Sequence, residues 1–199
     1  MPTEDLISLP MDEPIWERFF SVYPLVLVST LDPDGNHDIA PKHLAMPMSW
    51  QNWFGFVCTP SHHTYQNIQR SGEFTVSFPR PDQVALSSLA ASPRCDHDSK
   101  PIISALPVSP AQSVNGVLVD HCYLFLECEL DRIVEPFGIN SLIIGRICAA
   151  QIAEQALREL DRDDNDVIKE EPLLAYLYPF RFAVIDRSQG FPKPAGFKR

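Results

Sequence analysis

The sequence predicts a mainly β fold, a barrel built from short strands with a few short helices. Apolar segments of strand length recur along the chain, separated by turns rich in proline, glycine and aspartate. At least two pairs of these segments are close enough in sequence to form hairpins, and helical periodicity is confined to a few short stretches. This pattern is typical of an all-β barrel with helices at its margins.

The 199 residues are predicted to form one main domain with two short extensions. We expect residues 1–20 to be an arm, residues 21–187 to be the barrel domain, and residues 188–199 to be a tail. Pro14 is expected to start a short helix in the arm. The apolar residues of this helix lie at helical spacing: Ile15, Trp16, Phe19 and Phe20. That face needs a partner, either the core of the same chain or a second subunit.

The composition excludes several classes of protein. The chain carries 16 basic and 26 acidic residues, a net charge of −10, and no stripe of Lys and Arg, so a nucleic-acid surface is not expected. No apolar run approaches the roughly 18 residues of a membrane span. The first residues are acidic and interrupted by proline, unlike a secretory signal. These features favour a cytoplasmic protein.

The five cysteines are odd in number and have no C-x-x-C spacing. Cys58, Cys128 and Cys148 lie in apolar, strand-like runs, so we expect them to be reduced core residues.

The first part of the chain alternates strands and tight turns. Residues 25–31 are continuously apolar and β-branched, as in a buried strand. The residues Asp-Pro-Asp-Gly at 32–35 predict a turn, with proline preset for its second position and glycine accepting a positive φ. A second strand is expected over residues 36–40, with Pro41 ending it. Residues 53–58 are aromatic-rich and predict a third strand.

A short helix follows, over residues 62–70, with Gly72 just past its end. Residues 73–78 alternate as a half-buried strand, and residues 82–91 have a helical pattern. Residues 92–120 are rich in proline and serine and predict a long excursion. Loops of that length in a compact domain usually serve a function or cover something.

The second part of the chain contains the most regular strand, residues 123–134. Its apolar residues alternate with Glu127, Glu129 and Asp131. This alternation predicts a sheet with one face exposed to solvent, and therefore an antiparallel sheet. Residues 142–150 are expected to return as a further strand. The remaining predictions are a short helix after residue 152, an exposed acidic loop over 161–166, and two strands, 173–177 and 180–186, that finish the sheet.

The first candidate site is the segment Ser61-His62-His63-Thr64 at the start of the short helix. The first amides of a helix lack internal partners, and the helix dipole favours negative charge there. With two hydroxyls and two imidazoles added, the segment predicts a phosphate site. The alternative is ordinary capping, in which the side chain of Ser61 or Thr64 accepts from the backbone. No metal site is expected, because adjacent histidines seldom chelate one ion and no HxH or HxxxH motif lies nearby.

The second candidate site is the strand end that contains Ala40, Pro41, Lys42 and His43. Its backbone donors could meet a flat polar ring, and Lys42 or His43 could stabilise negative charge on that ring. The alternative is a plain strand end with two solvated side chains. Other chemistry finds no support, because the sequence has no G-x-S-x-G elbow, no G-x-G-x-x-G fingerprint and no Walker loop.

Two longer motifs carry a family resemblance. The pattern P-x-V-L-V-S-T-x-D-x-D-G-x-x-x-x-A-P spans residues 24–41, and T-x-x-N-I-x-x-x-G-E-F-x-V-x-F-P spans residues 64–79. In order and spacing they resemble the flavin reductase-like family of FMN-binding split barrels. The stretch LECELDRIVEPFGINSLIIGRICAA looks like the second half of that barrel, and PLLAYLYPFRFAVI like its closing strand. The resemblance covers about residues 20–187.

The resemblance implies an FMN-binding homodimer with the flavin near the subunit interface. It implies that residues 40–44 line the isoalloxazine ring, and that four residues hold the phosphate with Asn67 nearby: Ser61, His62, His63 and Thr64. Family members commonly pass hydride from NADH or NADPH to flavin and supply reduced flavin to a partner oxygenase. The implied enzyme is thus an NAD(P)H-dependent flavin oxidoreductase, in which Lys42 and His43 stabilise the charge of the reduced ring.

The chain departs from the family pattern at four places. Asp38 stands where asparagine is common, and His43 where a small hydroxyl residue is common. Asn140-Ser141 replaces a His-Thr pair, and Arg146 replaces a glutamate. Two other functions therefore remain open, an FMN carrier without turnover and a flavin-free dimeric interaction domain.

Overall fold

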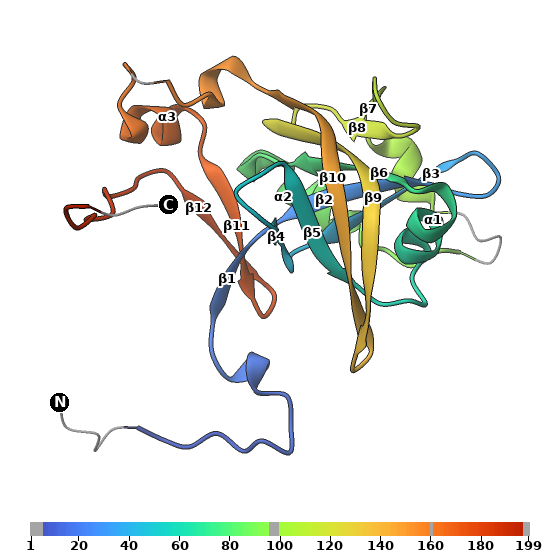
Figure 1. The fold of residues 1–199 in the computed structure, drawn as a ribbon, viewed down its shortest axis with the longest axis horizontal. Coiled ribbons are helices and arrows are strands. Elements are labelled where there is room, and N and C mark those ends of the chain that lie inside the picture. The colour runs from blue at the N-terminus through green and yellow to red at the C-terminus, as the bar shows by residue number, and fades with distance from the viewer. Residues whose placement is uncertain (1–5, 96–99, 160, 197–199) are drawn as a thin grey trace.

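The computed structural model describes residues 6–95, 100–159 and 161–196. Its centre is a curled, seven-stranded antiparallel sheet with the strand order β3-β2-β6-β9-β10-β5-β4 (Figure 1). The mainly β split-barrel class expected from the sequence is confirmed. The strands of this sheet are β2 (Val26–Leu31), β3 (His37–Lys42), β4 (Ala45–Pro47), β5 (Trp53–Cys58), β6 (Glu73–Phe78), β9 (Leu124–Phe137) and β10 (Asn140–Ile152).

Short helices and two smaller sheets surround the main sheet. The α-helices are α1 (His63–Ser71), α2 (Val84–Leu89) and α3 (Asp164–Glu170), and the 3-10 turns are η1 (Ile15–Arg18), η2 (Pro81–Gln83), η3 (Pro101–Ala105) and η4 (Glu154–Ala156). The smaller sheets are formed by β1 (Ser21–Pro24), β11 (Leu173–Tyr178) and β12 (Arg181–Ile185), and by β7 (Val108–Pro110) and β8 (Val117–Val119). No helix in the described part of the chain is long and apolar enough to cross a membrane.

The β2–β3 hairpin forms as its turn residues predict. Gly35 has a φ of 87° and donates its amide to the carbonyl of Asp32 over 3.1 Å. One expectation was wrong, because Pro41 does not end β3 but lies within it, paired with Leu27. Proline is tolerated there because β3 is an edge strand, so its missing N–H breaks no ladder. The strand consequently extends to Lys42.

The main core lies inside the curl of the seven-stranded sheet. Phe74 of β6 and Phe56 of β5 are 1% and 0% exposed, and their rings meet edge to face with centroids 5.5 Å apart. Ile68 of α1 packs against the same core. The helix thereby closes one end of the barrel, and the residues before it are held at the rim.

Gly145 of β10 leaves the space that the Phe74 ring occupies. A Cβ atom at this position would lie 2.6 Å from two carbons of that ring and 3.1 Å from the carbonyl oxygen of Glu129. We expect Gly145→Ala to lower the free energy of unfolding by about 1–3 kcal/mol, the usual cost of overpacking a core. Urea unfolding measures it, with Gly190→Ala as the control, because a Cβ at Gly190 meets nothing within 4 Å. Equal stability of the two variants would contradict this packing.

The described residues 100–120 of the excursion pack against the outer face of the sheet. Its η3 segment and the β7–β8 hairpin supply Leu106, Val117 and Val119 to a second apolar cluster that includes Leu27 and Ile39. The long loop therefore covers a face of β2 and β3, as expected from its length.

The prediction of a solvent-exposed face on β9 is wrong at Glu127. This carboxylate is 1% exposed and accepts the backbone N–H groups of Gln112, Ser113 and Val114. A buried carboxylate needs such donors, and the excursion supplies three of them. Glu129 and Asp131, farther along the strand, are exposed as the alternation predicts.

The last two strands were expected to finish the main sheet, and this expectation was also wrong. They pair instead with β1 in the order β1-β11-β12, a separate sheet that lies beside the barrel (Figure 1). The small sheet therefore joins segments from the two ends of the chain.

Two further expectations need correction. The acidic run at 161–166 is not only a loop, because α3 begins at Asp164 and the Asp163 side chain caps it by accepting the amide of Asn165 over 2.7 Å. Aspartate at and near a helix start is favoured by the free amides there. Cys148 is exposed rather than a core residue, whereas Cys58 and Cys128 are buried free thiols as expected.

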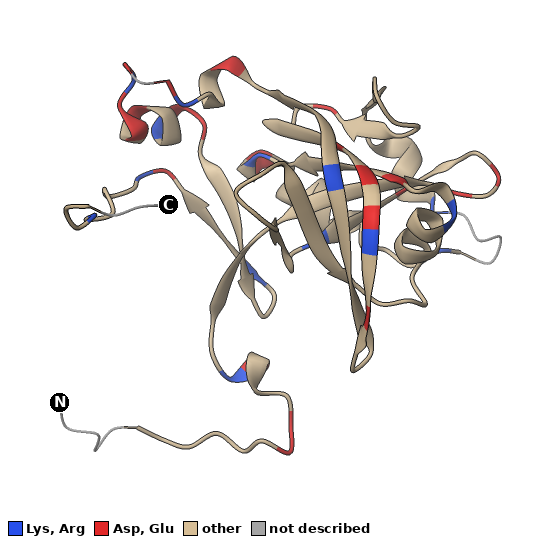
Figure 2. Ribbon diagram, viewed as in Figure 1, with Lys and Arg blue, Asp and Glu red and all other residues tan. Residues whose placement is uncertain are grey.

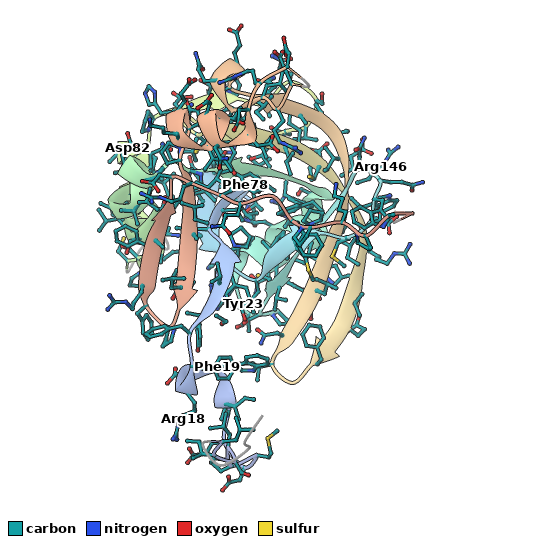
Figure 3. All side chains as sticks on the ribbon, turned by 90° about the vertical axis from the view of Figure 1, so that its left-hand side faces the viewer. Arg18, Phe19, Tyr23, Phe78, Asp82 and Arg146 are labelled. Atoms are coloured by element: carbon teal, nitrogen blue, oxygen red, sulfur yellow. The ribbon has the colours of Figure 1, made fainter. Side chains whose placement is uncertain are left out.

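The N-terminal arm leads away from the sheets. Figure 3 shows Arg18 and Phe19 beyond the body of the molecule, whereas Tyr23 lies at the small sheet. The apolar residues Trp16, Phe19 and Phe20 of the arm are all exposed. Within the described chain, the apolar face predicted for this segment is not covered by the core.

Candidate functional site

The two candidate segments line one cavity of about 340 Å³. The end of β3 contributes Ala40, Pro41 and Lys42, and the start of α1 contributes all four residues from Ser61 to Thr64. A third wall comes from the segment after α2 and from Lys100. Residues about 20 positions apart in sequence thus face the same space, because α1 packs against both β2 and β3.

The start of α1 is not capped by the side chain of its own N-cap residue. His62 is that N-cap residue, in extended conformation, and its side chain makes no capping hydrogen bond. The backbone carbonyl of His62 accepts from Tyr65 and Gln66, as in a regular helix start. Among the hydrogen bonds of the described residues, none is a capping bond to the side chain of Ser61 or Thr64. The amide end of the helix opens toward the cavity.

Two basic side chains of the excursion, not identified from the sequence, complete the cavity. Arg94 Nη2 lies 2.9 Å from Asp32 Oδ2 and 3.1 Å from Asp38 Oδ1. Lys100 Nζ lies 3.7 Å from Asp38 Oδ1 and donates to the carbonyl of Ile39 over 2.8 Å. Asp38 is 4% exposed, so it holds both cations in fixed positions within a nearly buried network.

No local pattern marks these cations in the sequence. Arg94 stands 62 positions after the Asp32 that it contacts, and Lys100 stands 61 positions after Ile39. The one available signal was the length of the excursion, since long loops often serve a site.

Asn67 lies behind the cavity rather than in its wall. Its side chain is 2% exposed, and its amide donates to Thr30 Oγ1 over 3.0 Å and to Asp32 Oδ1 over 2.8 Å. Since Asp32 also holds Arg94, Asn67 connects α1 to the cationic wall. Its place in the structure is that of a support for the site.

His43 also points away from the main cavity. Its ring lies among three tyrosines, with centroid distances of 5.7 Å to Tyr23, 4.7 Å to Tyr176 and 5.7 Å to Tyr178. It lines two adjoining cavities, of about 450 Å³ and 210 Å³, that border on Pro41. Burial, followed by the charge of Lys42, lowers the pKa of His43 below its usual 6.5, so the ring is neutral at pH 7.

The electrostatics of the cavity differ from those of the whole molecule. Acidic residues gather elsewhere, over α3 and along β9 (Figure 2). The described lining contains Lys42, Arg94, Lys100 and the carboxylate of Asp38, and a second carboxylate, Asp32, pairs with Arg94 from behind the lining. Burial, then the positive charges of Lys42 and His63, lower the pKa of His62. A cationic field at this spot favours an anion.

These features together fit a phosphate group. Helix amides, two hydroxyls and several cations converge on one open space, which are the donors that phosphate oxygens require. A metal ion fits the described residues less well, because they contain no group of three His, Cys, Asp or Glu side chains placed to hold an ion.

The remaining departures from the family pattern lie outside the cavity. Asn140 accepts the hydroxyl of Thr59 over 3.0 Å and lines the small cavity beside His43. Arg146 pairs with Glu129 over 2.6 Å on the exposed face of β9 and β10. Asn140 and Arg146 thus have partners within the chain, whereas the buried Ser141 Oγ makes no hydrogen bond among the described residues.

Comparisons with known proteins agree with this fold. The family model described as "Flavin reductase like domain" matches residues 20–178. An uncharacterized protein of Methanothermobacter thermautotrophicus is 26% identical over 160 residues, which cover 76% of this chain and 73% of that protein.

Solved structures share this fold at lower sequence identity. Nitrilotriacetate monooxygenase component B from Bacillus cereus has a TM-score of 0.80 and 18% identity, with 96% of this chain and 100% of that chain covered. Flavoredoxin of Desulfovibrio vulgaris has a TM-score of 0.73 and 21% identity, with coverage of 96% and 98%. The 2-nitrobenzoate 2-nitroreductase NbaA of Pseudomonas fluorescens has a TM-score of 0.74 and 17% identity, with coverage of 89% and 87%. At these identities the structures establish a common fold.

Proposed function

Because this chain belongs to the flavin reductase-like domain family, we propose that it binds FMN and passes hydride from NAD(P)H to the flavin or onward to an acceptor. One observation carries the proposal: two segments selected on chemical grounds line a single cavity with cationic walls. A flavin-related oxidoreductase function is consistent with the relatives of known structure, among them a flavoredoxin and an oxygenase component.

The phosphate is assigned to the start of α1. The amides of the first helical turn and the side chains of Ser61, His62, His63 and Thr64 face it from one side. Arg94 and Lys100 face it from the other side, held there by Asp38. A doubly negative phosphate would be stabilised here even though the molecule as a whole is acidic.

The ring is assigned to the end of β3 and the residues that follow. When bound, the isoalloxazine supplies the centre that accepts and releases hydride. Lys42 offers the positive charge that stabilises a reduced, anionic ring. His43 is neutral at pH 7, so its contribution is a hydrogen bond or a stacking surface supported by the three tyrosines. No protein nucleophile is needed for this chemistry.

The proposal includes a homodimer in the cytoplasm that serves a partner oxygenase. The exposed apolar arm, with Trp16, Phe19 and Phe20, supports a contact with a second copy. One structural relative is named as component B of a nitrilotriacetate monooxygenase, and this supports an oxygenase as the partner.

The alternatives are an FMN carrier without turnover and a flavin-free dimeric interaction domain. Absorbance near 450 nm after incubation with FMN and gel filtration distinguishes either flavoprotein from the flavin-free domain. Oxidation of NADH or NADPH with FMN present, followed at 340 nm, distinguishes the reductase from the carrier. A protein that retains no flavin would refute the proposal.

A double substitution tests the phosphate assignment. We expect His62→Ala with His63→Ala to weaken FMN binding by about tenfold or more, because hydrogen bonds to a charged group are worth about 1.5–3 kcal/mol each. Riboflavin, which lacks the phosphate, should bind both proteins equally. Fluorescence titration measures both affinities, and Gln69→Ala, an exposed change on the same helix, is the control. An equal loss for FMN and riboflavin would contradict the assignment.

A further inference from the structure

A cavity of about 450 Å³ is lined by α2 and by the β11–β12 hairpin, which lies beside the barrel (Figure 1). We call it the hairpin cavity, and its volume falls within the roughly 300–1,000 Å³ of small-molecule sites. None of the residues from Ser61 to Thr64 belongs to its described lining, which shares only Pro41 and Ala91 with the cavity at the start of α1. The hairpin cavity is therefore a space that the proposed phosphate site does not use.

Aromatic side chains dominate the lining of the hairpin cavity. The β11–β12 hairpin supplies Tyr176, Phe180 and Phe182, and Leu25 and Val84 add apolar surface. The hydroxyl of Tyr176 accepts the amide of Phe180 over 3.1 Å, which ties that ring to the hairpin turn. Aromatic rings favour offset or edge-to-face contact with another ring. The lining therefore suits a flat, aromatic ligand.

Phe180 has a backbone conformation that its own side chain disfavours. Its φ is 56°, in the left-handed region that glycine reaches without strain and a bulky residue does not. Strain of this kind gathers at ligand sites, where the side chain itself is needed. The ring of Phe180 is 85% exposed and lines the hairpin cavity, so it is available to a ligand.

Two polar side chains in the lining have no partner of their own. Ser87 of α2 is 0% exposed, and its Oγ makes no hydrogen bond among the described residues. A buried hydroxyl without a partner is costly, and a polar ligand atom would supply the missing hydrogen bond. Arg181 is exposed and has no ion-pair partner within the described chain. The described lining contains no Asp or Glu, so it offers a positive charge that no carboxylate neutralises there.

We propose that the hairpin cavity binds a small aromatic carboxylic acid in its ionised form, with a hydroxyl group on the ring. The carboxylate bonds to Arg181, because a planar guanidinium matches a carboxylate in a two-point contact. The ring lies among Tyr176, Phe180 and Phe182, and the ligand hydroxyl meets Ser87 Oγ. The inference does not rest on FMN binding, since none of these residues lines the cavity of the phosphate site.

An NMR titration of the full-length protein with para-hydroxybenzoate tests the proposal. Para-hydroxybenzamide has nearly the same shape but no charge, and we expect it to bind about tenfold more weakly, because a hydrogen bond to a charged group is lost. Cyclohexanecarboxylate keeps the charge but lacks the aromatic ring, so it should bind several-fold more weakly. Equal affinities for the acid and the amide, or no binding of the acid, would overturn the proposal.

The competing occupant of the hairpin cavity is the isoalloxazine ring of FMN, because Pro41 and His43 line the cavity and also belong to the proposed ring site. We expect para-hydroxybenzoate to bind the FMN-loaded protein with the same affinity as the protein without FMN. Displacement of the acid by FMN would overturn the proposal and assign the cavity to the flavin ring. Binding of the acid by a protein that retains no FMN would support this inference and refute the proposed function.

Arg181→Gln localises the carboxylate. We expect this variant to bind para-hydroxybenzoate about tenfold more weakly and para-hydroxybenzamide equally well. Arg187→Gln is the matched control, because Arg187 is exposed, lies outside the lining and loses the same charge. Equal losses of affinity in the two variants would overturn the assignment of the carboxylate to Arg181.

Two further variants test the cavity without endangering the fold. Ser87→Ala removes a hydroxyl that has no partner, and Phe180→Gly relieves a left-handed φ. We therefore expect neither change to lower stability in urea unfolding, whereas each should weaken para-hydroxybenzoate binding several-fold. Unchanged affinity in both variants would show that the acid does not occupy the hairpin cavity.

Discussion

Replacement of Lys42 by glutamate is expected to weaken FMN binding about 100-fold, which corresponds to about 2.7 kcal/mol. The substitution exchanges an attraction for a repulsion in a part of the cavity where Asp38 already supplies one negative charge. Charges that are shielded from water interact at an effective dielectric well below that of the solvent, so one reversal has a large effect. Isothermal titration of FMN at fixed salt concentration measures it.

Lys169→Glu is the matched control for this charge change. Lys169 lies exposed on α3, outside the lining of the cavity, and the substitution alters the net charge by the same amount. If both variants lose affinity equally, the effect belongs to the overall charge of the molecule rather than to the site.

Replacement of Glu127 by alanine is expected to lower the free energy of unfolding by about 3 kcal/mol. The change leaves the amides of residues 112–114 without their acceptor, and each unsatisfied buried group costs about 1–3 kcal/mol. The loss should appear first as faster hydrogen exchange at those amides, because the Glu127 carboxylate is the acceptor that protects them. Urea unfolding and amide exchange measured by NMR give the two quantities.

Glu129→Ala serves as the control, because Glu129 is exposed on the same strand and its ion-pair partner among the described residues, Arg146, is exposed as well. Surface pairs of this kind contribute about 0–1 kcal/mol. A Glu127 variant that matches the stability of this control would show that the carboxylate does not anchor the excursion.

The sequence predicted the elements whose signal is local. Gly35 and Gly72 both adopt positive φ at the turn and helix end where they were expected, because only glycine reaches that region without strain. The strands β2, β5 and β6 follow from runs of apolar and β-branched residues. The residues from Ser61 to Thr64 were selected by the same local reasoning, from the chemistry of a helix start.

The errors concern contacts between distant segments. Nothing near Glu127 in the sequence reveals that amides 112–114 will enclose it, so its alternation with apolar neighbours suggested a wet surface. Pro41 was read as a strand end because its neighbours do not disclose that β3 is an edge. Arg94 and Lys100 reach the cavity only because the excursion folds back over β3. A periodic pattern describes a segment, whereas these three outcomes depend on what packs against it.

The opposite signs of the cavity and of the whole chain have a consequence for how an anion arrives. With a net charge of −10, the molecule repels a phosphorylated ligand at long range and attracts it only in the last few ångströms. Dissolved ions shorten the reach of both fields, to about 8–10 Å at cellular ionic strength. Dissolved ions weaken mainly the long-range repulsion, because the cations inside the cavity are screened less than charges on the surface. Moderate salt should therefore ease the approach of the ligand to this protein, the reverse of its effect on a uniformly basic receptor.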